Sequence, residues 1–269
     1  MLQTISKSKL FYLLLIYYFV LVWWWIHIYF SGIKDAPQNY YYGFFYAFIA
    51  LAGGLNGLFV SRTWGGFKSL LGKAVVFMSI GLLLECFGQF LWSYYNIVAK
   101  VEMPFPSMAD IGYFLMIPSY TLGALFFAKA AGAKYAFKEL RANILTIIGI
   151  PAIMLIAVYF LLLQSNTINL SSAIETIRTF LNYYSPIGEG ITISIAILSY
   201  ILFRKYLGGS MKSRILFILF ALVIDFLAGM TFLYQAATGT YYNGGINDLM
   251  FTTSFAIMAI GLLTFKSYE

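Results

Sequence analysis

The sequence predicts an all-α polytopic membrane protein that crosses the bilayer eight times. Composition is the first reason: 61% of the residues are hydrophobic and only 10% are charged, whereas a soluble domain has about 25% charged residues. Apolar stretches about 20 residues long, enough for a helix to span the hydrocarbon core, recur along the whole chain. The third reason is the placement of the basic residues, which gather on alternate predicted loops.

The eight predicted spans follow directly from the apolar stretches. They cover residues 10–30, 40–61, 74–97, 109–129, 142–164, 184–204, 214–236 and 247–266. The first stretch is too long for the apolar part of a typical signal peptide, and no clear small-x-small cleavage site follows it. We therefore expect it to be retained as the first span.

The charge distribution predicts the orientation in the membrane. With eight spans, both termini lie on one side, together with the loops 62–73, 130–141 and 205–213. These segments and their flanks hold fourteen of the 17 basic residues. Three basic residues are left for the other side: Lys34, Lys100 and Arg178. Because cytoplasmic loops carry the excess of Lys and Arg, we expect both termini in the cytoplasm.

Weak internal similarity predicts that the chain is a duplication. A shift of 138 residues aligns the segment from Ser107, SMADIGYFLMIPSYTLGALFFAK, with the segment from Gly245, GINDLMFTTSFAIMAIGLLTFKS. The aligned pairs are Asp110 with Asp248, Tyr113 with Phe251, Gly123 with Gly261 and Phe127 with Phe265. We expect one membrane domain made of two parallel four-helix repeats, residues 1–133 and 134–269, related by an axis along the membrane normal.

Five acidic residues fall in the predicted outer half of the membrane domain, and no basic residue in a span is placed to neutralise them. They are Glu85, Asp110, Glu189, Asp225 and Asp248. Such residues cost at least about 2.5–3.5 kcal/mol in hydrocarbon and usually face a bundle interior or a wet cavity. The sequence therefore predicts an acidic cavity that opens on the side opposite the termini.

The predicted ligand-binding residues are Glu85, Gln89, Trp92, Glu189 and Asp225. The first three lie at i, i+4 and i+7, on one face of span 74–97. An acid, an amide and an aromatic ring on one stripe favour a cation or amine pocket, with a cation–π contact from the ring. Two other interpretations stay open for Glu85 and Asp225: a shared proton in a relay, or a hydrogen bond that links helices.

Three polar residues are predicted to cap the outer helix ends or to form the cavity rim: Ser107, Asp110 and Asp248. Ser107 and Asp110 have the spacing of a capping box, and an acid in the first turn is favoured by the helix dipole. Glu189 lies in SPIGEGIT, where we expect a broken or flexible helix start. Irregular backbone is tolerated at such depth where it lines a cavity.

Residues 91–120, LWSYYNIVAKVEMPFPSMADIGYFLMIPSY, resemble the membrane-embedded N-terminal regions of prokaryotic signalling proteins such as diguanylate cyclases and histidine kinases. There a Trp and a Tyr end one span, a PxPSxAD turn follows, and a Tyr and a Pro lie on the next span. The matching residues are Trp92, Tyr95, Pro104, Pro106, Ser107, Ala109, Asp110, Tyr113 and Pro118. This resemblance covers 30 of the 269 residues, and no output domain is expected after Glu269. It implies a sensing module in a prokaryotic cytoplasmic membrane, with a partner protein that carries the signal.

Several function classes are not expected. The sequence has no glycine-rich nucleotide loop, no zinc-ligand spacing and no acid cluster for a magnesium diphosphate, and it holds one histidine, His27, and one cysteine, Cys86. We therefore expect no cofactor, metal site, catalytic residue or nucleic-acid partner. The leading hypothesis is binding or sensing of a small ligand or cation. The alternatives are a secondary transporter or proton-coupled permease that uses Glu85 and Asp225, and an intramembrane lipid-processing enzyme.

Overall fold

Long helices make up the computed structural model, which describes residues 8–101, 103–130, 149–154, 156, 159, 168–206 and 209–266. Six helices in these ranges are long and apolar enough to cross a membrane. They are α2 (Lys9–Ser31), α3 (Pro37–Thr63), α4 (Leu70–Tyr94), α5 (Met108–Ala130), α9 (Gly209–Ala237) and α10 (Ile246–Leu263). They indicate a multi-pass membrane protein, as the sequence predicts.

Two short helical turns and one longer helix also have defined bounds, and the described residues 149–154 are helical. The turns are η1 (Gly66–Lys68) and the π-helical η2 (Tyr95–Ala99), which continues α4. Helix α8 (Ala173–Tyr206) is 34 residues long and contains the predicted span 184–204, but it is not among the six apolar helices. The predicted span 142–164 and the predicted boundary at 133/134 lie largely outside the described residues, so the count of eight spans stays a prediction.

The expected break in the helix near Glu189 is wrong, because α8 runs without interruption through Pro186. Proline removes one intrahelical hydrogen bond, the one to the carbonyl of Asn182. Helices packed in a membrane bundle tolerate this loss because their neighbours hold the backbone in place. Here α8 packs against α5 on one side and α9 on the other.

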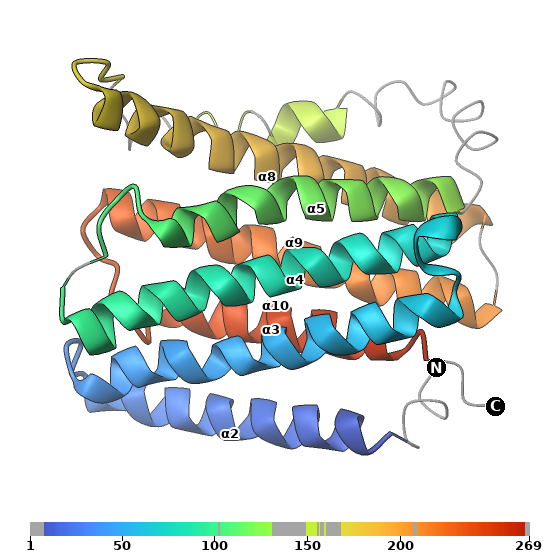
Figure 1. The fold of residues 1–269 in the computed structure, drawn as a ribbon, viewed down its shortest axis with the longest axis horizontal. Coiled ribbons are helices and arrows are strands. Elements are labelled where there is room, and N and C mark those ends of the chain that lie inside the picture. Colours follow the sequence, from blue (N-terminus) through green and yellow to red (C-terminus); the bar gives the residue numbers. More distant parts are fainter. Residues whose placement is uncertain are drawn as a thin grey trace.

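The helices form a closed ring. Each helix contacts the next in the order α3, α4, α5, α8, α9 and α10, and α10 contacts α3. Helix α2 packs outside this ring, in the groove between α3 and α10. The helices lie side by side with their axes roughly parallel (Figure 1). Helix α2 begins at the end of the bundle at which α10 ends. The interior of the ring is the place where side chains from both halves of the chain meet.

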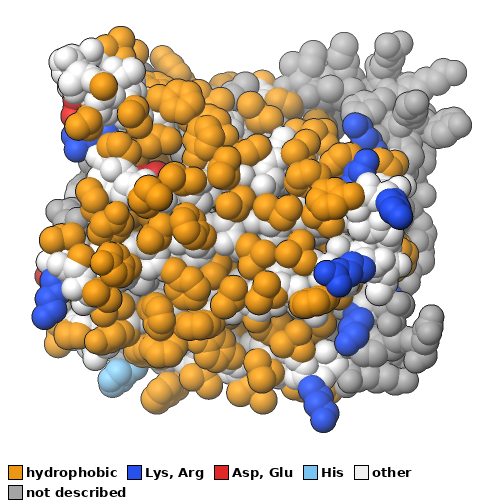
Figure 2. Space-filling view, in the orientation of Figure 1, with side chains coloured by type: hydrophobic (Ala, Val, Ile, Leu, Met, Phe, Trp, Pro, Cys, Tyr) orange, Lys and Arg blue, Asp and Glu red, His pale blue; other side chains and the backbone are white. Residues whose placement is uncertain are grey.

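The surface separates apolar and basic residues. Figure 2 shows hydrophobic side chains over the middle of the visible face, with most Lys and Arg side chains at the end of the bundle where α2 begins. Large apolar side chains on α2 are strongly exposed, including Phe30 at 81% and Trp23 at 69%. Such a belt suits contact with lipid tails, since the bilayer is as apolar as these side chains.

The aligned residues of the two halves make matching contacts. Gly123 of α5 faces Met78 of α4, and a Cβ atom on this glycine would lie 2.9 Å from the Met78 Cε. Its aligned partner, Gly261 of α10, faces Ile218 of α9 at 2.8 Å. The aligned phenylalanines touch each other, with the ring centroids of Phe127 and Phe265 5.8 Å apart. Both glycines thus lie in close contact with the helix that precedes their own in the chain, while the duplication itself stays a prediction.

Candidate functional site

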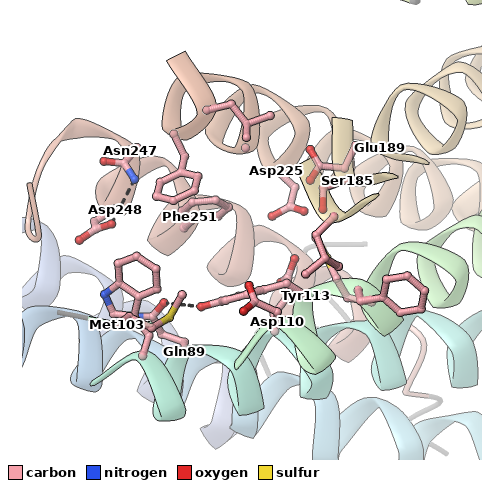
Figure 3. A pocket seen from close by; sticks show the side chains of 18 of the residues that line it. Gln89, Met103, Asp110, Tyr113, Ser185, Glu189, Asp225, Asn247, Asp248 and Phe251 are labelled. Carbon is pink, nitrogen blue, oxygen red and sulfur yellow. Dashed lines mark hydrogen bonds between the residues drawn. The ribbon is translucent and has the colours of Figure 1, made fainter. Parts of the chain in front are cut away.

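A cavity of about 190 Å³ lies inside the ring of helices. All five intramembrane acids predicted from the sequence line it: Glu85, Asp110, Glu189, Asp225 and Asp248. Its other lining residues are mostly aromatic, and no Lys, Arg or His in the described part of the chain lines it. Figure 3 shows Asp248 and Asn247 at one end of the cavity, and Asp225 and Glu189 at the other. The cavity is thus acidic at both ends.

The innermost acids, Glu85 of α4 and Asp225 of α9, approach each other across the ring. Tyr120 donates a hydrogen bond from its hydroxyl to Glu85 Oε2 at 3.0 Å. Ser254 donates to Asp225 Oδ1, also at 3.0 Å. The two carboxyl groups are close enough to interact electrostatically. Because like charges repel, two neighbouring carboxyl groups favour a form in which one of them holds a proton or a cation lies between them.

Glu189 reaches the same region from α8. Its carboxyl lies against Gly229 of α9, where an added Cβ atom would come within 2.5 Å of Glu189 Oε2. Asp225 is close enough to interact with it electrostatically. A glycine at position 229 therefore makes room for this third carboxyl group, which has no counterpart in the first half of the chain.

The outer acids, Asp110 and Asp248, occupy equivalent positions in the first turns of α5 and α10. Asp110 Oδ2 accepts a hydrogen bond from the Ser107 backbone N–H at 2.5 Å, and Ser107 Oγ accepts one from the Ala109 N–H at 3.1 Å. Asp248 Oδ2 accepts a hydrogen bond from the Gly244 N–H at 2.6 Å. Both acids satisfy backbone donors at a helix start, as the capping-box pattern predicts.

Gln89 and Trp92 extend the stripe of Glu85 toward the outer end of α4. Tyr113 of α5 donates a hydrogen bond from its hydroxyl to Gln89 Oε1 at 3.2 Å, a bond that Figure 3 marks. Trp92 donates from its indole nitrogen to Asn243 Oδ1 at 2.8 Å. These bonds fix the amide and the indole, so both present defined faces to the cavity.

Three aromatic rings lie close together at the outer end of the cavity. Trp92, Phe232 and Tyr241 make pairwise edge-to-face contacts, with ring centroids 5.1 to 6.0 Å apart. Tyr241 also donates a hydrogen bond to Asn243 Oδ1 at 3.2 Å. Burial raises the pKa of the Tyr241 phenol well above its usual value, helped by the nearby charge of Asp248. The phenol therefore remains a neutral donor at ordinary pH.

Three residues that line the cavity each have a buried oxygen atom with no protein hydrogen-bond donor. They are Glu85 Oε1, Glu189 Oε2 and Asn247 Oδ1. Glu85 is only 2% exposed and Asn247 only 1%. An unsatisfied buried polar atom costs about 1–3 kcal/mol. Since all three atoms are acceptors, the groups that would satisfy them are hydrogen-bond donors.

A second, smaller cavity of about 20 Å³ continues from the first. The two share Met116, Glu189 and Asp225, and the smaller one adds Tyr120 and Thr192 to its lining. Its volume exceeds the roughly 10–15 Å³ that one water molecule needs. Tyr120 and Thr192 therefore place some polar lining past the innermost acids, toward the end of the bundle where the basic residues lie.

The structure brings together every residue predicted to bind ligand: Glu85, Gln89, Trp92, Glu189 and Asp225 all line the cavity. Asp110 and Asp248 line it while capping their helices, and Ser107 caps α5 without lining it. Whether any of them binds a ligand stays a prediction.

The sequence analysis did not identify Tyr120, Ser254 or Asn247, whose amide oxygen lacks a hydrogen-bond donor. Tyr113 and Tyr120 are seven residues apart on α5, so they lie on one face of it. That spacing, opposite the stripe of Glu85, was the available signal.

No protein-family model, curated protein or solved structure matches the chain. The site must therefore be interpreted from its own chemistry. Within the described ranges, no three His, Cys, Asp or Glu side chains are grouped so that they could share one metal ion. The arrangement instead offers separated carboxyl groups, aromatic faces and unsatisfied acceptors.

Proposed function

We propose that the chain is a membrane-embedded binding module for a small organic cation, an amine in particular. The observation that carries this proposal is the cavity lined by five carboxyl groups, with no Lys, Arg or His among its described lining residues. A bound cation supplies the positive charge that the described lining residues lack. Without a cation, these buried carboxyl groups must hold protons or water.

The spacing of the acids favours an organic cation over a metal ion. Metal ions of the calcium and magnesium type need six or more oxygen ligands around one point, and the described acids are not grouped in that way. Aromatic side chains such as Trp92 and Tyr113 line the same cavity as the acids. Ammonium groups are attracted to aromatic faces, so carboxyl groups and rings together suit an amine.

The volume also limits the ligand. A cavity of about 190 Å³ is below the roughly 300–1,000 Å³ typical of pockets for drug-sized molecules. It is larger than the space needed by a single water molecule. A small aliphatic amine is therefore a better match than either a hydrated ion or a lipid headgroup with its acyl chains.

We further infer that the site lies on the axis of a duplication. Glu85 and Asp225 are 140 residues apart, as are Trp92 and Phe232. The first pair interacts electrostatically across the ring, and the second pair is in ring contact. In a two-fold arrangement, a residue can touch its own equivalent only near the axis. This supports two parallel repeats, 1–133 and 134–269, with a shared cavity between them. The basic residues at the end of the bundle that holds the termini (Figure 2) support cytoplasmic termini.

The position of the segment that resembles signalling proteins supports a sensory role. Residues 91–120 comprise the end of α4, the following turn and the first half of α5. They contribute Trp92, Asp110 and Tyr113 to the cavity. We propose that the segment forms one wall of a sensing pocket in a prokaryotic cytoplasmic membrane, and that a partner protein carries the signal onward.

Calorimetric titration of the purified protein in lipid nanodiscs tests the proposal. Butylamine and tetramethylammonium are the probes, with butanol as the uncharged control. We expect saturable binding of the amines, no binding of butanol, and loss of at least tenfold in affinity in Glu85→Gln. The matched control is Glu175→Gln, because Glu175 is paired with Arg178 at 2.7 Å on the surface and does not line the cavity. Absence of amine binding by the wild type would refute the proposal.

A proton-coupled permease is the second candidate, and the smaller cavity is the observation that favours it. Polar lining continues past Asp225 to Thr192, which a closed binding pocket does not require. In proteoliposomes, a permease accumulates labelled butylamine when a pH gradient is imposed, and Asp225→Asn abolishes accumulation. Binding without any accumulation would assign the site to sensing instead.

A further inference from the structure

The unsatisfied acceptors fall at two levels of the cavity. At the inner level are Glu85 Oε1 and Glu189 Oε2, beside Asp225. At the outer level is Asn247 Oδ1, beside Asp248, to which Asn247 donates a hydrogen bond from its amide nitrogen at 3.3 Å. Each level thus combines carboxyl groups with a buried oxygen that lacks a donor. One ligand group at either level would leave the other level unsatisfied.

The distance between the levels follows from α10. Asp248 lies six residues before Ser254, whose hydroxyl donates to Asp225. At 1.5 Å per residue, the two levels are about 9 Å apart along the helix. This separation is greater than one ammonium group can bridge, because its charge-assisted hydrogen bonds reach only about 2.7–2.9 Å.

The wall between the levels is aromatic. Phe251 and Phe255 follow Asp248 at i+3 and i+7, on the same face of α10, with their ring centroids 6.2 Å apart. Tyr113 lies on the opposite wall, in electrostatic range of both Glu85 and Asp248. In Figure 3, Tyr113 and Gln89 lie between the two acidic ends. A flexible methylene chain is the kind of group that packs on such rings without needing hydrogen bonds.

We propose that the cavity takes a linear diamine or polyamine, with one ammonium group at Glu85, Glu189 and Asp225 and a second at Asp248 and Asn247. An alkylammonium group has three hydrogen-bond donors and no acceptor, so each end supplies what the orphaned oxygens lack. The methylene chain lies along the rings of Phe251, Phe255 and Tyr113. This inference rests on the proposed function, since it names the ligand class for the same site.

The test is a chain-length series measured by calorimetry in nanodiscs at constant ionic strength. The probes are butylamine, putrescine, cadaverine, hexamethylenediamine and octamethylenediamine. Joining two weak contacts in one molecule makes the second contact intramolecular, and its benefit is greatest when the linker matches the span. We expect the best diamine to bind at least tenfold more tightly than butylamine, with an affinity maximum inside the series.

Asp248→Asn locates the second ammonium group. The asparagine oxygen can still accept the hydrogen bond of the Gly244 N–H, so the helix start is kept. We expect this variant to bind every diamine only as tightly as butylamine, while its butylamine affinity stays within threefold of the wild type. Asp35→Asn, an acid in the loop that precedes α3 and outside the cavity lining, is the matched control and should keep the length dependence. Thermal melting in detergent checks that both variants fold.

The outcomes distinguish failure of the diamine assignment from failure of the proposed amine site. If butylamine and all diamines bind equally, the diamine assignment is overturned while the amine site stands. If a length optimum appears but Asp248→Asn leaves it unchanged, the placement of the second ammonium is wrong. If no amine binds, the proposed function fails together with this inference.

Discussion

The outer and inner acid pairs of the cavity differ in what holds them. Asp110 and Asp248 each accept a backbone N–H at a helix start, so their carboxyl groups are satisfied by local structure. Glu85 and Asp225 lie in the middle of their helices, and their donors, Tyr120 and Ser254, come from neighbouring helices. The outer pair therefore depends on a few consecutive residues, and the inner pair depends on the whole ring.

This difference shows that carboxyl groups lining the same cavity can have different roles. A carboxyl group committed to a helix cap contributes to stability whether or not ligand is present. One that keeps a buried acceptor without a donor, as Glu85 does, gains most when a ligand supplies that donor. We therefore expect substitutions in the inner pair to act mainly on monoamine binding, and substitutions of Asp110 in the outer pair mainly on folding.

Monoamine affinity should show the largest contrast between the pairs. We expect Asp225→Asn to weaken butylamine binding by about 100-fold, or about 2.8 kcal/mol at 1.4 kcal/mol per tenfold change. Asp110→Asn should change it by less than threefold, because its hydrogen bond to the Ser107 N–H can be kept. Calorimetric titration of both variants measures this. Equal losses in the two variants would remove the distinction between inner and outer acids.

Helix packing around Tyr120 tests how the inner pair is held. Gly81 of α4 lies under the Tyr120 ring, and a Cβ atom at position 81 would come within 2.4 Å of it. Overpacking of this kind costs about 1–3 kcal/mol, so we expect Gly81→Ala to lower the free energy of unfolding by that amount. It should also displace the Tyr120 hydroxyl from Glu85. Unfolding by SDS titration in mixed micelles measures the effect.

The control for this prediction is the same glycine substitution in a Tyr120→Leu background. Without the ring, Gly81→Ala should cost less than about 0.5 kcal/mol, because coupling between contacting residues is removed. An undiminished cost in this background would show that the ring is not what constrains position 81.

Helix capping at the outer pair should have a moderate effect on stability alone. We expect Asp110→Ala to lower the free energy of unfolding by about 1 kcal/mol, the usual cost of a lost cap. Asp110→Asn should cost less, because its amide oxygen can accept the same bond from Ser107. SDS titration of both variants tests this. A loss in Asp110→Asn as large as in Asp110→Ala would mean that charge, not the hydrogen bond, dominates at this helix start.

The contrast between the pairs also explains which features could be predicted from sequence. Hydrophobic length predicted the positions of the long helices, and capping patterns predicted the roles of Ser107 and Asp110, because both signals lie within a short stretch of chain. The stripe of Glu85, Gln89 and Trp92 predicted one wall of the cavity from helical periodicity alone. Each of these depends on residues that are neighbours in sequence or one turn apart.

Features that depend on distant segments could not be predicted in this way. The partners of Glu85 and Asp225, Tyr120 and Ser254, lie 35 and 29 residues away. Their contacts are set by how α5 and α10 rotate against their neighbours. The continuity of α8 through Pro186 also depends on packing against α5 and α9, which the local pattern around the proline does not contain.

Coupling between the two inner donors should be the smallest measurable effect, and it is specific to the inner pair. Tyr120 and Ser254 are on different helices, but they donate to two carboxyl groups that interact electrostatically. In a double-mutant cycle of Tyr120→Phe and Ser254→Ala, we expect a coupling energy of about 0.5–1 kcal/mol from SDS titration. The cycle of Asp110→Asn with Asp248→Asn should be additive, because each acid is held by its own helix start. Additivity in the first cycle would mean that the carboxyl groups of Glu85 and Asp225 act independently, and the shared-proton or shared-cation contact between them would have to be abandoned.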